Sequence, residues 1–278
     1  MTVAGSVEPE LYRSGRRKRS RRRRFNLIAA LVGVAVAVTV VVAPDWGLLA
    51  EKYADLDRAR DLFPDIVTTA TKNTLVYTTF SFIGGLLLGV SAALLRMSSL
   101  RAYRWIAAVY IEVFRGLPAL LTIVLVGLIT PVALQFQFPE ILGVPTGGIV
   151  ALSLVAGAYL AETVRAGIEA VPKGQIEAAR SLGMTHTTTL WRVVMPQAIR
   201  IIVPPLTNEL VLLLKDTSLL AVLGVTIATK ELTQFGQDAA NQGYNATPLL
   251  AAGLMYLMVT IPLTRLVAYL ERRNKVMR

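Results

Sequence analysis

Long uninterrupted apolar stretches constrain this chain more than any other feature. A helix needs about 20 mostly apolar residues to cross the hydrocarbon core of a membrane. Six windows of that kind occur, with limits near 25–43, 67–95, 105–131, 147–165, 199–224 and 247–270. A spanning backbone must satisfy its own hydrogen bonds in lipid, and the windows show no strand-like alternation. The sequence therefore predicts an all-α integral membrane protein with about six transmembrane helices.

The charge of the chain also fits a membrane protein. The net charge is +11, yet 54% of the residues are hydrophobic. A soluble nucleic-acid-binding protein would account for the charge but not for the hydrophobicity. We therefore expect no nucleic-acid partner, and we expect the run RRKRSRRRR (16–24) to anchor the N-terminus beside anionic lipid headgroups.

The distribution of Lys and Arg predicts the orientation. Nine of them lie in residues 1–24. An even number of spans places others on the same side: Arg96, Arg101, Arg104, Lys173, Arg180, Arg192, Arg200, Arg272, Arg273, Lys275 and Arg278. The opposite side carries the acidic stretch 45–65, of which 55–65 is expected to be a solvated surface helix. Because cytoplasmic loops collect Lys and Arg, both termini and the 166–198 loop are predicted to be cytoplasmic.

Several catalytic classes have no residues to support them. The chain has no cysteine, no G-x-x-x-x-G-K-[ST] phosphate loop and no H-E-x-x-H zinc motif. Its single histidine, His186, lies in a polar loop. We expect no catalytic residue, no metal ligand and no cofactor bound by this chain, so it is not predicted to be an enzyme.

The longest cytoplasmic loop is the most informative. Residues Gln175 to Leu182 favour a helix, and Gly183 follows where a left-handed cap is commonly needed. Ile176, Ala179 and Leu182 would form a small apolar face. From the pattern alone, this helix either docks into a partner's groove or lies on lipid headgroups.

The same loop resembles the EAA loop of ATP-binding-cassette (ABC) importer permeases. The match consists of Glu177-Ala178-Ala179, then Gly183, then Pro196, with Val193 and Met195 at two apolar positions. Further segments are similar to the polar amino-acid branch of that family. They are Asn73-Thr74-Leu75, Glu112-x-x-Arg115-Gly116-x-Pro118, Ala161-Glu162-x-x-Arg165-Ala166-Gly167, Pro196-Gln197-Ala198, Pro204-Pro205-Leu206 and Lys215-Asp216-Thr217-Ser218-Leu219.

The resemblance implies an importer for polar amino acids of the glutamate, glutamine or basic class in a bacterial plasma membrane. Glu177, Ala178, Ala179, Gly183 and Pro196 would couple to a cytoplasmic ABC ATPase dimer, which binds ATP and Mg²⁺. A second permease subunit, identical or homologous, and an extracytoplasmic amino-acid-binding protein would complete the assembly.

The expected domain organisation differs from that of the family at the N-terminus. It comprises a basic tail (1–24), an extra span with an acidic linker (25–66), a five-helix permease domain (67–272) and a basic C-terminus (273–278).

Ionisable residues within the spans mark candidate functional positions, because a charge in lipid costs roughly 3 kcal/mol or more. Glu112 with Arg115, and Glu162 with Arg165, are spaced as i, i+3 pairs. These pairs would act either as interhelical clamps or a gate, or only as snorkelling anchors.

A polar stripe is predicted on the fifth span, where Asn208, Glu209, Lys215 and Asp216 recur at seven-residue spacing. The stripe would line the substrate path or pack between subunits. Pro204 and Pro205 should bend the helix just before it. Ser81, Gly85, Gly89 and Ala93, by contrast, predict a close helix-packing face.

Two alternatives to an ATP-driven importer remain open at the level of sequence. One is a secondary amino-acid transporter driven by an ion gradient, and the other is a membrane scaffold or sensor without transport.

Overall fold

A computed structural model describes residues 25–276, except residues 37, 40, 43, 225 and 226. The predicted basic tail, 1–24, and the last two residues of the predicted segment 273–278 lie outside the described residues. The chain divides into two compact units, Met1–Ala54 and Asp55–Arg278. The described part of the first unit holds an apolar helix over Phe25–Val36 and α2 over Trp46–Tyr53. The helix over Phe25–Val36 overlaps the predicted first span, 25–43, and whether that segment crosses the membrane stays a prediction.

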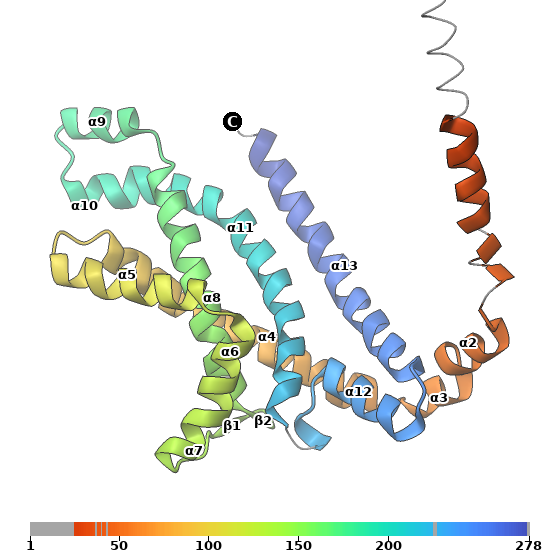
Figure 1. Ribbon diagram of the computed structural model, residues 1–278. Helices are drawn as coiled ribbons and strands as arrows, with labels where there is room; N and C mark the ends of the chain where they lie inside the picture. The colour runs from red at the N-terminus through yellow and green to blue at the C-terminus, as the bar shows by residue number, and fades with distance from the viewer. Residues whose placement is uncertain (1–24, 37, 40, 43, 225–226, 277–278) are drawn as a thin grey trace, which may run out of the picture. The chain divides into compact units, whose positions relative to one another are not determined.

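The second unit is built from helices, as Figure 1 shows. In chain order they are α3 (Leu56–Asp61), α4 (Lys72–Arg96), α5 (Arg101–Gly116), α6 (Ala119–Ile123), α7 (Thr130–Leu134), α8 (Thr146–Glu169), α9 (Lys173–Ser181), α10 (His186–Thr189), α11 (Met195–Asp216), α12 (Leu232–Gly243) and α13 (Thr247–Val276). Between them lie the π-helical segments η1 (Ile66–Thr71), η2 (Val124–Ile129) and η3 (Leu190–Val194), and the 3₁₀ segments η4 (Thr217–Leu223) and η5 (Ile227–Thr229). A small antiparallel hairpin pairs β1 (Glu140–Ile141) with β2 (Val144–Pro145).

The predicted spans correspond to helices of the second unit. Three described helices are long and apolar enough to cross a membrane: Ile66–Arg96, Thr146–Glu169 and Thr247–Arg272. They agree with the predicted windows 67–95, 147–165 and 247–270. Helix α11, Met195–Asp216, overlaps the predicted fifth window, 199–224, but carries four ionisable residues. The all-α membrane fold is confirmed, while the count of six spans stays a prediction.

The predicted third span, 105–131, is not one straight helix. It is broken between α5 and α6, and the two parts meet at a bend of 110°. Leu117, between them, has an extended backbone with ψ 142° because Pro118 follows it and disfavours the helical conformation. Helix α11, by contrast, continues through Pro204 and Pro205. The break at Pro118 was not predicted, and whether Pro204 and Pro205 bend or loosen α11 stays a prediction.

Helices α4 and α8 pack closely through small residues. A Cβ atom on Gly89 would lie 2.7 Å from Leu160 Cβ, and one on Gly85 would lie 3.0 Å from Ala156 Cβ. Two hydroxyls join the same helices, since Ser81 donates to the Ile149 carbonyl at 3.4 Å and Ser153 donates to the Ser81 carbonyl at 3.3 Å. The predicted packing face of Ser81, Gly85, Gly89 and Ala93 is confirmed.

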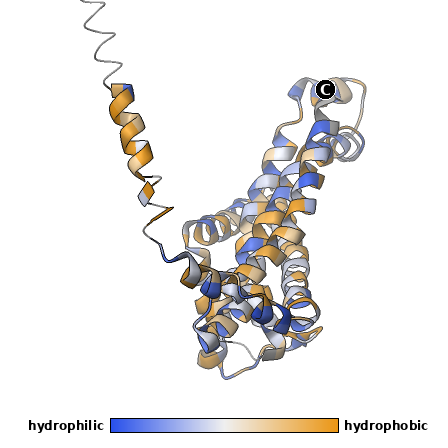
Figure 2. Ribbon diagram, turned by 90° about the vertical axis from the view of Figure 1, so that its right-hand side faces the viewer, coloured by the Kyte–Doolittle hydropathy of each residue, from blue (hydrophilic) through white to orange (hydrophobic). Residues whose placement is uncertain are grey.

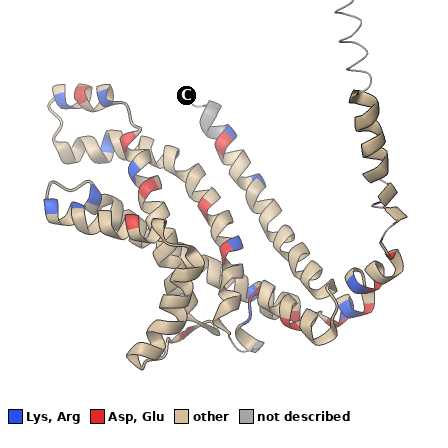
Figure 3. Cartoon of the chain, viewed as in Figure 1, with Lys and Arg blue, Asp and Glu red and all other residues tan. Residues whose placement is uncertain are grey.

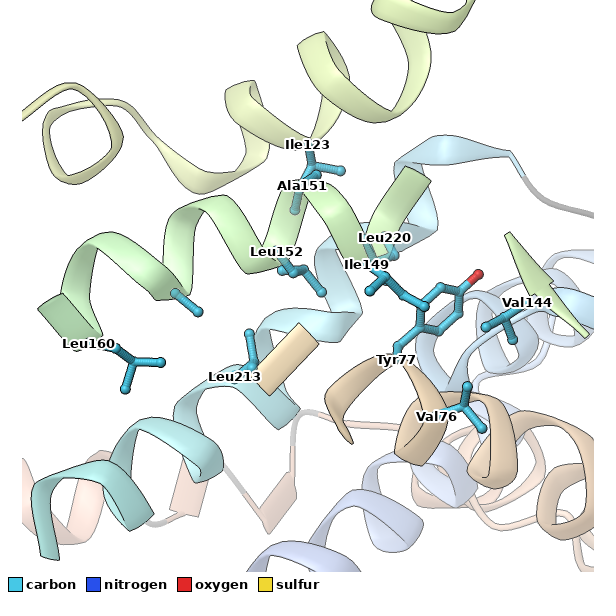
Figure 4. Packing of buried hydrophobic residues seen from close by; sticks show 11 residues of the cluster. Val76, Tyr77, Ile123, Val144, Ile149, Ala151, Leu152, Leu160, Leu213 and Leu220 are labelled. Atoms are coloured by element: carbon cyan, nitrogen blue, oxygen red, sulfur yellow. The ribbon is translucent and has the colours of Figure 1, made fainter. Parts of the chain in front are cut away.

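The main hydrophobic core gathers around helix α8. Tyr77 of α4, Leu152 and Leu160 of α8, and Leu213 of α11 are almost fully buried in it. Figure 4 shows these side chains with Ile123 of α6 and Leu220 of η4 around them. Helix α8 is thus the central helix of the second unit.

The acidic stretch 55–65 is partly attached to the rest of the second unit. Helix α3 has no buried residue, as expected for a surface helix. However, the Asp55 amide donates to the Thr247 hydroxyl at 3.1 Å, and Leu62, Leu232 and Ala252 share a buried cluster. The expectation of a merely solvated helix is wrong at both ends of α3, because these contacts fix it to α12 and α13.

The two ends of the second unit differ in composition. Figure 1 shows α9 and the end of α13 at one end and α12 with the hairpin at the other. Basic residues gather at the α9 end, on α9 itself and on the first turn of α5 (Figure 3). Hydrophobic residues predominate along the long helices between the ends (Figure 2). This arrangement is typical of a protein that spans a membrane.

Candidate functional site: a coupling helix and a carboxylate-lined cavity

Helix α9 has a complete C-terminal cap. Gly183 adopts the left-handed conformation with φ +83°. Its N–H donates to the Arg180 carbonyl at 3.0 Å, and the Met184 N–H donates to the Ala179 carbonyl at 3.1 Å. Together they form the Schellman motif, which satisfies carbonyls that the helix end leaves unpaired. The predicted helix and the left-handed glycine are both confirmed.

The two faces of α9 differ from the predicted arrangement. Ala179 is buried, and Ile176 packs against the cluster that contains Val194, so both face inward. Glu177, Ala178 and Gly183 are exposed, and Leu182 is 85% exposed. Ile176 and Ala179 thus hold α9 on the unit, and the outward residues alone can meet a partner. The proposed coupling role of Pro196, which is exposed near the start of α11, stays a prediction.

A pair of glutamines that the sequence analysis missed connects α9 to α11. The Gln197 amide donates to the Gln175 side-chain oxygen and, at 2.8 Å, to the Val193 carbonyl. Gln197 belongs to the Pro196-Gln197-Ala198 segment, but nothing in its spacing indicates a partner on α9. This contact joins the start of α11 to the helix that carries the EAA residues.

Of the two predicted ion pairs, one forms. Arg165 binds Glu162 and also Glu169, whose carboxylate is 2.6 Å from the guanidinium. A cavity of about 370 Å³ beside them is lined by Arg96, Met97, Arg104, Glu162, Arg165 and Glu169. The cluster holds three basic and two acidic side chains at the α9 end of α8, and both ion pairs of Arg165 lie within α8. Whether these residues act as a clamp, a gate or snorkelling anchors stays a prediction.

The predicted pair of Glu112 with Arg115 is wrong. No ion pair joins these two residues. The Arg115 guanidinium instead lies 5.5 Å from the centre of the Tyr159 ring, on helix α8. A cation over an aromatic face is attracted by the negative charge density of the ring. Tyr159 therefore competes for Arg115, and i, i+3 spacing on one helix does not reveal that competitor.

A cavity of about 330 Å³ lies where α8, α11 and the break between α5 and α6 meet. We call it the central cavity. Its lining consists of Leu117, Ala119, Leu152, Val155, Ala156, Tyr159, Glu209, Leu212, Leu213 and Asp216. The break thus supplies part of the wall, in the way that discontinuous helices of transporters line binding sites.

The predicted polar stripe of α11 is divided by the central cavity. Glu209 and Asp216 line it and are half-buried. Asn208 and Lys215 are exposed and lie outside the lining. Residues seven apart share a helix face and sequence neighbours do not, which separates the carboxylates from the amine and the amide. Whether Asn208 and Lys215 contact substrate stays a prediction.

A buried carboxylate, that of Glu231, lies at the hairpin end. Glu231, 1% exposed, accepts hydrogen bonds from the Gln234 N–H at 2.7 Å and the Tyr256 hydroxyl at 2.8 Å. The Asn73 amide donates to the Ala228 carbonyl at 2.8 Å, and the Thr74 hydroxyl accepts from the Leu232 N–H at 3.0 Å. Burial raises the pKa of the Glu231 carboxyl above its usual range, although its hydrogen bonds oppose that shift. These contacts attach α12 to α4 and α13.

Among the described residues, no three His, Asp or Glu side chains gather closely enough to hold a metal ion. The fold and the site together define a helical membrane protein, with a carboxylate-lined cavity and a capped helix exposed at one end.

Comparison with known proteins places the chain in a family. Residues 85–276 match the family described as "Binding-protein-dependent transport system inner membrane component", and the chain belongs to that family. It is similar to the L-cystine transport system permease protein TcyB of Bacillus subtilis, with 34% identity over 85% of this chain and 94% of TcyB. It is also similar to the arginine transport system permease protein ArtQ of B. subtilis, with 37% identity over 73% of this chain and 89% of ArtQ.

A solved structure agrees with these relatives. The chain resembles a crystal structure of an amino acid ABC transporter with histidines, at 34% identity and a TM-score of 0.69. The likeness covers 77% of this chain and 95% of that chain.

Proposed function

We propose that the chain is the permease subunit of an ABC importer for polar amino acids, of the glutamate, glutamine, basic or cystine class. The observation that carries this proposal is the family match over residues 85–276, which includes the exposed, capped α9 and the central cavity. The names of the relatives, which transport cystine and arginine, favour an amino acid as substrate.

The proposed partners follow from the family. A separate ATPase hydrolyses ATP with Mg²⁺, and an extracytoplasmic binding protein delivers the amino acid. Two permease subunits, identical or homologous, would pair with an ATPase dimer. The α9 end and both termini would face the cytoplasm of a bacterium, with the basic tail beside anionic lipid headgroups.

The proposed coupling runs through α9. The Schellman cap and the contacts of Ile176 and Ala179 make α9 a firm part of the unit. Closure of the ATPases would push on Glu177, Ala178 and Leu182, and the contact between Gln175 and Gln197 would pass that movement to α11. Helix α11 carries Glu209 and Asp216, so its movement would open the central cavity to one side of the membrane and then to the other.

Purified components test this function. The chain is co-expressed with an ABC ATPase and studied with a binding protein from the same organism. We expect the amino-acid-loaded binding protein to stimulate ATP hydrolysis severalfold, and the Gly183→Asp variant to lose that stimulation while still inserting into the membrane. The proposal would be contradicted if the rate of ATP hydrolysis were the same with and without the chain in every tested combination.

A further inference from the structure

We propose that a cavity at the α9 end of α4, α5 and α8 binds the headgroup of an anionic phospholipid, with phosphatidylglycerol as the simplest example. We call it the headgroup cavity. Its volume is about 370 Å³, and it is lined by Arg96, Met97, Arg104, Glu162, Arg165 and Glu169. The inference concerns the lipid around the protein and does not depend on what the protein transports.

The headgroup cavity lies at the level where a bilayer has its polar headgroups. Arg96 is the last residue of the helix Ile66–Arg96, which is long and apolar enough to cross a membrane. Helix α5 begins at Arg101, and Tyr103 and Trp105 in its first turns are exposed. Tyr and Trp are enriched at the boundary between hydrocarbon and water. The ends of both helices therefore place the cavity at that boundary.

Two arginines of the headgroup cavity have no carboxylate partner. Arg165 binds both Glu162 and Glu169. Arg96 and Arg104 line the same cavity but form no ion pair with a described residue. Arg96 is near enough to Glu162 for its charge to act on that carboxylate, which Arg165 already occupies. Arg96 and Arg104 are thus the two cations that a bound anion can reach.

The charges around the headgroup cavity sum to a positive value. Its lining holds three arginines and two glutamates. An adjoining cavity of about 610 Å³, which shares Glu169 with it, adds Lys173 and Arg180 and no further carboxylate. Arg115 is a further cation whose charge acts on Glu162. A headgroup with a net negative charge is therefore favoured over a zwitterionic one, as in basic pockets between membrane helices.

The backbone of the α4–α5 turn holds Arg104 in place. Its Nη1 atom donates to the Ser98 carbonyl at 2.9 Å and to the Ser99 carbonyl at 2.8 Å. Arg96 Nη1 donates to the Arg104 carbonyl at 3.4 Å. The guanidinium group has five N–H donors in a fixed plane that matches the oxygens of a phosphate, so each side chain keeps donors for a ligand.

An apolar stripe on α4 leads to the headgroup cavity. Ile83, Leu87, Val90 and Leu94 recur at helical spacing and are all exposed. Met97 continues this spacing, is exposed, and lines the cavity. An acyl chain that lies along the stripe would bring its phosphate to the mouth of the cavity beside Met97. This continuity indicates a lipid as the occupant, since a soluble phosphate has no apolar chain to place there.

Native mass spectrometry of the full-length chain in detergent tests the choice of ligand. Dioleoyl phosphatidylglycerol and dioleoyl phosphatidylcholine have the same acyl chains and differ in net charge. Glycerol 3-phosphate has the phosphate without the chains. We expect phosphatidylglycerol to bind at least tenfold more tightly than phosphatidylcholine, and glycerol 3-phosphate not to bind at the concentrations that saturate the lipid site.

Variants test the residues. Arg96→Gln and Arg104→Gln are each expected to weaken phosphatidylglycerol binding about fivefold. Arg192→Gln removes the same charge at an exposed position of η3, outside both cavities, and is expected to change binding less than twofold. Every variant keeps the basic tail, 1–24, so any attraction of lipid to that tail is common to all of them.

Photo-crosslinking locates the lipid on wild-type protein, so it decides the matter even where a variant folds poorly. The probe is a phosphatidylglycerol with a diazirine near the glycerol end of one acyl chain. We expect crosslinks on the end of α4, at Leu94 and Met97, and an excess of unlabelled phosphatidylglycerol is expected to suppress them.

Four results would each overturn the inference. An equal loss of binding in Arg192→Gln and Arg96→Gln would indicate a general attraction to the basic end of the protein. Equal binding of phosphatidylcholine would remove the role of net charge. Binding of glycerol 3-phosphate as tight as that of the lipid would identify a site for a soluble anion. Crosslinks confined to other parts of the chain would place the lipid elsewhere.

Discussion

Gly89 lies at a close approach between the backbones of α4 and α8. A Cβ atom there would be 3.0 Å from both the Ala161 nitrogen and the Gly157 oxygen, and backbone atoms cannot rotate away as a side chain can. In lipid, where apolar surface is not scarce, such close packing is a principal source of helix association. The four-residue recurrence of small residues was therefore a dependable signal in the sequence.

Gly89→Ala is expected to destabilise the protein by about 1–3 kcal/mol, because the added methyl group forces the two helices apart. Gly253→Ala on α13 is the control, since its Cβ would meet nothing within 4 Å and alanine favours a helix over glycine by up to about 1 kcal/mol. Thermal unfolding in detergent compares the two. Equal unfolding temperatures for Gly89→Ala and wild type would contradict the close contact.

Glu231 gives a prediction about pH. Its raised pKa means that the folded state binds the proton more tightly than the unfolded chain does, so stability falls as pH rises from about 4.3, the ordinary value for Glu, through the raised value. Glu231→Gln keeps an oxygen for the α12 cap but cannot ionise. We expect its thermal stability to change less over that interval than that of wild type. Parallel curves for the two proteins would show that Glu231 does not titrate there.

The sequence could predict a pairing within one helix but not the pairings between helices. Glu162 and Arg165 meet because both lie on α8, where i, i+3 spacing brings side chains together. Arg115 meets Tyr159, and Gln197 meets Gln175, through the tertiary fold. The separation of Glu209 and Asp216 from Asn208 and Lys215 on α11 likewise depends on where α8 and the broken span lie.

At the scale of elements, α9 was the most predictable part of the site. Its helix-forming residues and Gly183 set both its extent and its end. The direction of its apolar face was not predictable, since Ile176 and Ala179 are drawn into the cluster around Val194. Leu182 remains as the exposed apolar side chain that an ATPase can cover.

Leu182→Asp is expected to weaken association with the ATPase at least tenfold, because a charge would replace an apolar side chain in the proposed interface. Leu142→Asp is the control, at an exposed leucine in the hairpin at the other end of the unit. Co-purification and ATP hydrolysis measure the effect. An equal loss of ATPase association in both variants would mean that α9 is not the docking element.

The broken span shows a limit of sequence reasoning for elements. Pro118 and the pair Pro204 and Pro205 all lack the N–H group that a helix uses. The bend occurs at Pro118, after Gly116 and the extended Leu117, while α11 continues through its prolines. Missing donors mark where a helix is weak, and the surrounding packing decides where it breaks.

At the scale of the whole molecule, the orientation of the chain can be measured directly, because the natural sequence has no cysteine. Leu182→Cys and Leu142→Cys place one thiol at each end of the second unit, on side chains that are 85% and 63% exposed. A membrane-impermeant maleimide applied to intact cells is expected to label Cys at 142 and to leave Cys at 182 unlabelled until the cells are opened. The reverse pattern would invert the topology predicted from Lys and Arg.

We propose that transport by this chain is driven by ATP through a separate ATPase. Amino-acid uptake is measured into proteoliposomes that contain the chain, either alone or with the ATPase and the binding protein, energised by enclosed ATP or by an ion gradient. We expect uptake only with all three components and ATP, and we expect that uptake to be unaffected when the ion gradient is collapsed. Ion-driven uptake by the chain alone would contradict it and would identify a secondary transporter.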